Sequence, residues 1–223
     1  KNYKQFQLAD FNLTLDSPKF YLDKLLGSDT NEVDYGVLFA PFPQKIAKYN
    51  LSQETRKYDV AFCGQIGSYR SYRRNAIDKL INSNFNFFYS CAEQGFQITY
   101  DDMMQAYANS KIVINFSQST VQDHFQLKGR VFEAIASGAL LLEQAGSPID
   151  LCFVVGVHYD VFHSNDELIE KIQYYLDHPS ERIKMANAAH LEWINNFSGT
   201  HFWKRLIKLP YGTSNLTIGE HVE

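Results

Sequence analysis

Two patterns of hydrophobic positions alternate along the chain from residue 57 onward. Short apolar runs predict buried strands at 59–63, 85–89, 111–116, 139–143 and 159–162. Apolar residues at helical spacing predict a first helix that ends near 82. Further helices are predicted at 101–109, 127–136, 166–177, 179–195 and 200–209. Strands that alternate with helices form a mostly parallel sheet with helices on both faces. The predicted class is therefore α/β, with a Rossmann-like arrangement.

The first 56 residues follow a different pattern. Strands are predicted at 11–15 and 35–39 and a helix at 18–26, before a polar stretch that begins with two prolines. This pattern is typical of the end of a preceding domain and a linker. We therefore predict three parts: the remnant of that domain at 1–56, the Rossmann-like domain at 57–209 and a polar C-terminal tail at 210–223.

Composition narrows the class of partner. The 21 basic and 25 acidic residues give a formal net charge of −4, so nothing draws the whole protein toward nucleic acid, and any anion site must be local. The three cysteines lie far apart without zinc or redox spacing, which indicates a reducing compartment, the cytoplasm. No apolar run is long enough for a transmembrane segment, and no signal peptide opens the sequence. The start at Lys1 fits a fragment.

The candidate chemistry lies where predicted strands end, because open parallel sheets bind ligands at the carboxyl ends of their strands. The first strand is followed by Gly64-Gln65-Ile66-Gly67, whose glycines would let backbone N–H groups approach a phosphate. A plain strand-to-helix turn is the alternative. Behind it come Arg70, Arg73 and Arg74, for which a solvated helix face is the leading interpretation, ahead of an anion or nucleic-acid patch.

A second group of candidates opens the helix predicted at 127–136. Lys128 and Arg130 lie at its start, where two cations can neutralise a diphosphate. Glu133 follows Arg130 by three residues on the same helix face, where its carboxylate can accept hydrogen bonds from a ribose diol. A surface ion pair between Arg130 and Glu133 explains the same spacing equally well.

The sequence gives little support for a metal site or a catalytic triad. The seven histidines lack metal-ligand spacing, and no DxD motif is present, so no metal is expected. His124 lies in the loop predicted at 117–126, beside the candidate site, although loop histidines are more often solvated.

The run KGRVFEAIASGALLLEQ, followed by DELIEKIQYYLDHPSERIKMANAA and preceded by KYDVAFCGQIGSYRSYRRNAIDKL, resembles the C-terminal domain of GT-B glycosyltransferases. It is most similar to the spore-maturation CgeB-like group of glycosyltransferase-1-type domains. The resemblance covers roughly residues 57–208. It implies the second of two Rossmann-like domains facing a cleft, with the acceptor domain largely missing from this chain.

The resemblance also implies roles. Glu133 would hold the ribose hydroxyls, and Lys128 and Arg130 would face the diphosphate and stabilise its charge as catalytic residues. The implied donor nucleotide site comprises Gly64, Gln65, Gly67, Ser117, Lys128, Arg130, Glu133, Gly146 and Ser147. Many retaining members carry a second glutamate eight residues earlier, where this chain has Phe125, with Asp123 nearby.

The expected function is transfer of a sugar from a nucleotide-diphosphate sugar to a glycan, lipid-linked or protein acceptor, in bacterial polysaccharide or glycan biosynthesis. The expected partners are that donor, the acceptor and the missing N-terminal domain, without nucleic acid or a cofactor. A non-catalytic nucleotide-binding module predicts binding without turnover, and a structural domain that lost its site predicts no binding.

Overall fold

The computed structural model describes residues 12–14, 37–39, 52–67, 70–91, 98–119 and 125–208, with side chains for most of those from 52 onward. The chain divides into two compact units, one of residues 44–196 and one of residues 1–43 with 197–223. Among the described residues, no helix combines the length and the apolar character needed to cross a bilayer.

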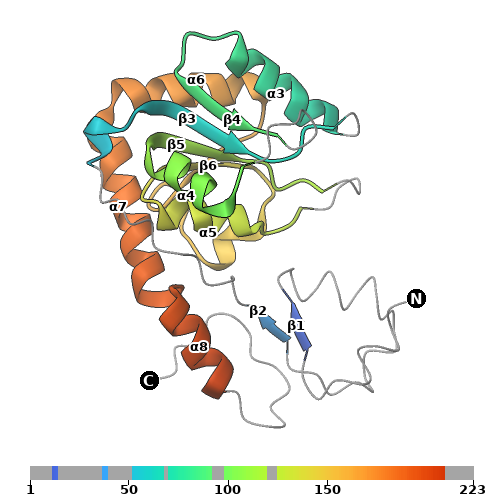
Figure 1. Ribbon diagram of the computed structural model, residues 1–223, viewed down its shortest axis with the longest axis vertical. Coiled ribbons are helices and arrows are strands. Elements are labelled where there is room, and N and C mark those ends of the chain that lie inside the picture. Colours follow the sequence, from blue (N-terminus) through green and yellow to red (C-terminus); the bar gives the residue numbers. More distant parts are fainter. Residues whose placement is uncertain are drawn as a thin grey trace. The chain divides into compact units, whose positions relative to one another are not determined.

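The larger unit is built on a five-stranded parallel sheet (Figure 1). Its order is β4-β3-β5-β6-β7, with bounds Phe87–Ser90, Tyr58–Cys63, Ser110–Asn115, Leu140–Gln144 and Asp160–Phe162. The chain leaves β3 toward β4 on one side and returns to β5 on the other. The order therefore reverses between β3 and β5, and a crevice at such a point is the usual binding position in open α/β sheets.

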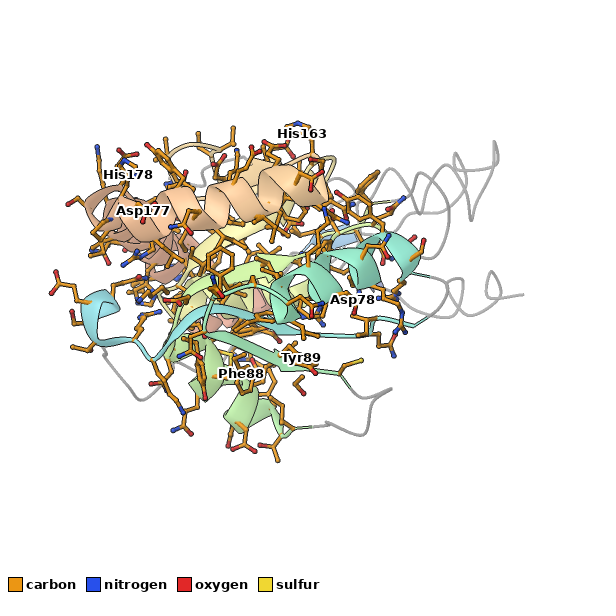
Figure 2. All side chains as sticks on the ribbon, turned by 90° about the horizontal axis from the view of Figure 1, so that it is seen from above. Asp78, Phe88, Tyr89, His163, Asp177 and His178 are labelled. Carbon is orange, nitrogen blue, oxygen red and sulfur yellow. The ribbon has the colours of Figure 1, made fainter. Side chains whose placement is uncertain are left out.

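Helices cover both faces of this sheet (Figure 1). On one face α3 (Ser71–Ile81) packs beside α6 (Asn165–Asp177), and on the other α4 (Tyr100–Ala108) packs beside α5 (Gly129–Ala136). The long helix α7 (Pro179–Asn196) contacts both α5 and α6. Figure 2, viewed from above, shows α6 reaching from near His163 to Asp177, with α3, which carries Asp78, nearby.

Alternation along the strands divides their side chains between the two faces. Val60, Phe62 and the equivalent residues of β5 and β6 join the core under α3 and α6, which Leu168 and Ile172 of α6 complete. The intervening residues point to the α4 and α5 side. Because helices cover both sides, the central strands are buried along nearly their whole length, including two polar side chains, Asn115 and Glu143.

The N-terminal residues of two elements, α6 and the one after Ser147, agree with the sequence prediction in position but differ from it in detail. The Ser164 hydroxyl caps α6 by accepting from the Glu167 N–H at 3.1 Å, as a capping box requires. The Glu167 carboxylate, however, accepts from the His163 N–H at 2.7 Å, one residue before the cap. Ser147 precedes Pro148, as expected, but the element it begins is the short 3-10 helix η6 (Pro148–Leu151), and its side chain makes no cap bond.

The described elements confirm the predicted α/β class and place nearly every strand and helix within a few residues of its expected position. In the smaller unit, β1 (Asn12–Thr14) pairs in parallel with β2 (Val37–Phe39), and α8 spans Gly199–Lys208. The helix predicted at 18–26 and the tail at 210–223 lie outside the described residues.

Residues just before β3 are hydrogen-bonded to the larger unit. The buried Arg56 guanidinium donates to the carbonyls of Ser110 at 2.9 Å and Ser137 at 3.0 Å, beyond the amino ends of β5 and β6. Gln53, in η3 (Gln53–Thr55), donates to the Gly138 carbonyl. Burial lowers the Arg56 pKa to about 10, with the neighbouring Arg182 charge adding to the effect. This chain segment therefore belongs to the Rossmann-like unit.

The α6 core generates a stability prediction. Leu168 is fully buried, so Leu168→Ala should lower the free energy of unfolding by about 2–5 kcal/mol through lost burial and a cavity. Leu191→Ala on α7 is the matched control, because Leu191 is 59% exposed and its loss should cost under about 0.5 kcal/mol. Urea denaturation measures both, and equal costs would contradict the packing described.

Candidate functional site

The predicted site residues gather at the carboxyl edge of the sheet. Gly64 follows β3, Ser117 comes shortly after β5, and Gly146 and Ser147 follow β6. Because these three strands are parallel neighbours, their ends meet at one edge, beside the point where the strand order reverses. The structure thus brings together segments that are up to 83 residues apart, from Gly64 to Ser147.

The first loop is shaped around an arginine from another element. A Cβ built on Gly64 would lie 2.7 Å from Nη1 of Arg130 and 2.9 Å from Cζ of Phe62. The Arg130 guanidinium lies over the Phe62 ring, 5.7 Å from its centroid. Gly64 is therefore needed for the close approach of the Arg130 side chain, a reason that the local sequence did not reveal.

Arg73 corrects the interpretation of the arginine cluster as a solvated face. It is buried, and its guanidinium donates to the backbone carbonyls of Gln65 at 2.8 Å and Phe116 at 3.0 Å. The same group lies over the Phe62 and Phe116 rings. Carbonyl oxygens thus compensate this cation, and Arg73 joins the loop after β3 to the loop after β5.

The start of α5 has the character of an anion site. Lys128 is its N-cap residue without a side-chain cap bond, and the first turn contains no acidic residue. The N–H groups of such a turn lack helix partners and favour negative charge. Arg130 lies in the same turn, and its buried Nε has no hydrogen-bond partner among the described residues. Cations are unfavourable at a helix N-terminus unless an anion is bound there.

Glu133 lies one turn further along α5 and is half-buried. Burial raises the pKa of its carboxyl, and the Arg130 charge opposes that rise. Among the ion pairs of the described residues, none joins Arg130 to Glu133, so the surface pair allowed by the sequence is not formed. Both side chains therefore remain open to a ligand on this side of the helix.

A row of polar side chains lies beneath α5 at the strand ends. Asn115 and Glu143 are register partners on β5 and β6 and are fully buried. The Asn115 amide donates to both carboxyl oxygens of Glu143, at 3.0 and 2.8 Å. Burial raises the Glu143 pKa to about 8, against the smaller opposing effects of Asn115, Ser147, Ser117 and Arg130. Sequence reasoning missed this pair because both residues end apolar strand runs.

Cys63 belongs to the same side of the sheet, at the end of β3. Burial raises the pKa of its thiol to about 11, and the Tyr107 hydroxyl of α4 lies beside it. Arg130 and Glu133 both act on these two groups electrostatically. The two side chains of α5 thus face a polar layer instead of an apolar one.

The turn after β6 completes the edge. Gly146 has φ +91°, a left-handed conformation that favours glycine, and a Cβ there would meet the Phe125 ring at 3.2 Å. Phe125 occupies the position of the second glutamate of many retaining enzymes, and here it packs on the turn. The Ser117 hydroxyl is buried and contacts the Gln144 carbonyl at 3.4 Å.

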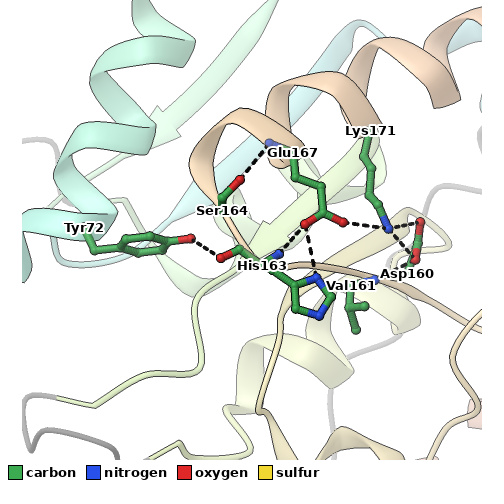
Figure 3. Close-up of polar contacts among 7 residues, drawn as sticks. All are labelled: Tyr72, Asp160, Val161, His163, Ser164, Glu167 and Lys171. Atoms are coloured by element: carbon green, nitrogen blue, oxygen red, sulfur yellow. Dashed lines mark hydrogen bonds and ion pairs between the residues drawn. The ribbon is translucent and has the colours of Figure 1, made fainter.

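The strand β7 also ends at this edge, where α6 begins (Figure 3). The Tyr72 hydroxyl of α3 donates to the His163 carbonyl at 3.4 Å. Lys171 bridges Glu167 at 3.4 Å and Asp160 at 2.9 Å. His163 is exposed and contacts Glu167, so these side chains hold the turn between β7 and α6 in place.

No candidate metal centre lies in the part of the chain that the structure describes. No group of three or more His, Cys, Asp and Glu side chains is placed there to hold an ion. His158 accepts a hydrogen bond from the Val154 N–H at 3.1 Å, and His124 lies outside the described residues.

Comparison with known proteins agrees with this geometry. A sequence profile of the glycosyl transferase-like family matches residues 52–208, and the chain belongs to that family. No curated protein sequence matches.

Three solved structures share the fold. Anabaena Alr3699/HepE, solved with UDP and glucose, is 12% identical, with 90% of this chain and 62% of that one covered and a TM-score of 0.62. TarM is 12% identical, with coverages of 93% and 45% and a TM-score of 0.60. The pneumococcal O-GlcNAc transferase GtfA, solved with UDP and GlcNAc, is 10% identical, with coverages of 93% and 46% and a TM-score of 0.60.

At these identities the likeness concerns the fold, which is that of GT-B glycosyltransferases. The chain spans about half to three fifths of the length of these proteins.

The contact between Gly64 and Arg130 generates a prediction. Gly64→Ala should lower the free energy of unfolding by about 1–3 kcal/mol, because the new methyl group displaces the guanidinium and the Phe62 ring. Gly129→Ala is the matched control, since a Cβ there meets nothing within 4 Å. Chemical denaturation compares the two, and a Gly64→Ala protein as stable as wild type would refute the close approach.

Glu143 generates a second prediction. The folded protein keeps this proton up to about pH 8, whereas an unperturbed glutamate loses it near 4.5. The unfolded state therefore binds fewer protons in this window, and stability falls as pH rises through it, by up to about 1.4 kcal/mol per pH unit. Glu143→Gln should remove this pH dependence of the free energy of unfolding and keep the pH dependence that comes from other titratable groups. Unfolding curves of both proteins from acid to neutral pH test this, and parallel profiles would contradict it.

Proposed function

We propose that this chain is the donor-binding part of a glycosyltransferase, which binds a nucleotide-diphosphate sugar and transfers its sugar to an acceptor. The observation that carries the proposal is Arg130, a half-buried cation whose buried Nε has no hydrogen-bond partner among the described residues, in the uncapped first turn of α5. A diphosphate supplies the negative charge that this turn lacks. The family membership and the UDP bound to two proteins of the same fold support the same assignment.

The neighbouring groups suit the rest of a nucleotide. Lys128 is the N-cap residue of α5, and its positive charge would be the second one available to the diphosphate. Glu133, one turn further along the helix, has a carboxylate suited to a ribose diol. Backbone N–H groups of the segments 64–67 and 145–147 flank the same edge of the sheet, where glycines allow close approach.

The chemistry assigned to the site is displacement at the anomeric carbon. An acceptor oxygen forms a bond to that carbon while the bond to the diphosphate oxygen breaks, and its electron pair leaves with the nucleoside diphosphate. The acceptor hydroxyl gives its proton to a base. Lys128 and Arg130 stabilise the charge that grows on the leaving group, where preorganised cations contribute most to catalysis.

Further parts of the proposal rest on the sequence. The string of motifs resembles the CgeB-like group, and on that resemblance we assign the chain to it, acting on a glycan, lipid-linked or protein acceptor in polysaccharide or glycan biosynthesis. Residues 1–43, which lie outside the Rossmann-like unit, are assigned to the end of a preceding domain that completes the cleft, and 210–223 to a tail. The three cysteines, which lie far apart without zinc or redox spacing, favour the cytoplasm.

Calorimetric titration with UDP, GDP, ADP and CMP tests the site. One nucleotide should bind, and Arg130→Ala should weaken it by about tenfold to hundredfold, as expected when a charge-assisted hydrogen bond worth about 1.5–3 kcal/mol is lost. Glu133→Ala should weaken nucleoside diphosphates but leave inorganic pyrophosphate unaffected, because the ribose contact is absent from pyrophosphate.

Lys184→Ala is the control for Arg130→Ala, because it removes an exposed cation of α7. Equal weakening by Lys184→Ala would show that general charge attraction, and not the α5 site, drives binding. Assays of the full-length protein with the corresponding sugar nucleotide then separate an enzyme from a non-catalytic module. Binding without turnover supports the module, and absence of binding to the full-length protein supports a structural domain.

A further inference from the structure

Glu143 is a carboxyl group that the proposed chemistry does not use, and its surroundings are unusual. It is fully buried at the end of β6, at the edge where the donor would bind. Asn115 donates to both of its oxygens, and among the ion pairs of the described residues none involves Glu143. A buried charge without a paired cation is costly, so the neutral acid is the form that this site favours.

Polar atoms around the carboxyl lack partners. The Oδ1 of Asn115, the Oγ of Ser147 and the Nε of Arg130 are each buried without a hydrogen-bond partner among the described residues. Ser147 and Arg130 both lie near enough to act on the Glu143 carboxyl. A neutral acid has one O–H to donate, and Ser147 and Asn115 both offer an acceptor oxygen. The cluster therefore links the carboxyl to the turn after β6 and to α5.

We propose that Glu143 is a positioning residue of the donor site, which as a neutral acid leaves the charge of Arg130 free for the diphosphate. This inference rests on the proposed function. When the carboxyl ionises, its negative charge competes with the diphosphate for Arg130. Donor affinity should therefore require the proton on Glu143.

Among the groups near Glu143, Glu133 also has a raised pKa and lies at the donor site, and the Glu143→Gln variant distinguishes its titration from that of Glu143. Burial raises the pKa of Tyr159, which precedes β7, to about 12. Ser117, Ser147 and Asn115 are neutral. The remaining titratable groups on this side of the sheet are Glu133, whose pKa is raised by burial, Cys63, at about 11, and Tyr107, raised well above its usual value.

The sign of the effect follows from linkage. If the ionised form binds the diphosphate poorly, the dissociation constant rises once the pH passes the Glu143 pKa of about 8 in the free protein. Full loss of binding by the ionised form gives a rise of about tenfold between about pH 7 and about pH 9. Conversely, bound diphosphate should raise the Glu143 pKa, because linkage is reciprocal.

The experiment is titration of this protein with UDP, or with whichever nucleotide it binds, across that pH range. Wild type should weaken by about tenfold, and Glu143→Gln, which keeps the size and neutrality of the acid, should stay within about twofold. Glu170→Gln is the matched control, because it neutralises an exposed glutamate of α6 and should follow wild type. If Glu143 had only a structural role, the Glu143→Gln protein would keep the pH dependence of nucleotide binding.

A second measurement needs no variant. Carbon-13 NMR of glutamate-labelled wild type should show one carboxyl that titrates near pH 8 and moves to higher pH when nucleotide is added. A flat wild-type profile, an equal rise in Glu143→Gln, or a Glu143 carboxyl that ionises in the ordinary acid range would each overturn the inference while nucleotide binding stands. If wild type, Glu143→Gln and Glu170→Gln all fail to bind nucleotide at neutral pH, the proposed function itself is refuted, and the inference with it.

Discussion

The parallel register of β3, β5 and β6 is the constraint on which the candidate site depends. It ends three neighbouring strands at one edge and aligns Asn115 with Glu143 on the side that faces α5. The first turn of α5 then brings Arg130 across the end of β3, where Gly64 leaves room for it. Anion site, polar layer and glycine loop are thus consequences of one pairing pattern, and a shift of one residue in β6 would turn Glu143 to the opposite face.

The arginines show how the same residue type serves two purposes at this edge. Arg73 is satisfied by the carbonyls of Gln65 and Phe116, so its charge is used inside the protein to fix two loops. Arg130 lies over the same Phe62 ring but keeps an unpartnered Nε. The first joins the two loops of this edge, and the second is the cation that we propose for the diphosphate. Preorganisation of this kind lowers the entropic cost of binding an anion.

Much of the fold could be predicted from the sequence, because the strands of a sheet covered on both faces are apolar runs, and the helices between them carry apolar stripes. For Arg130 and Glu133, the sequence predicted the edge of the sheet at which the structure places them, and their roles toward a donor stay a prediction. The site was not predictable at Arg73 or Glu143. Whether an arginine is solvated or buried against carbonyls depends on loops about 45 residues apart, and a glutamate that ends the run ALLLE has no local sign of the amide that faces it.

The hydrogen bonds of Gln53 and Arg56 bear on where this protein can be cut. These side chains donate hydrogen bonds to the carbonyls of Ser110, Ser137 and Gly138, at the edge of the sheet opposite the candidate site. A shortened protein that began at β3 would lose these hydrogen bonds, including the two buried ones of Arg56, although its sheet would be intact. The usable start of the isolated Rossmann-like unit therefore lies before Gln53, and a fusion partner should be joined upstream of it.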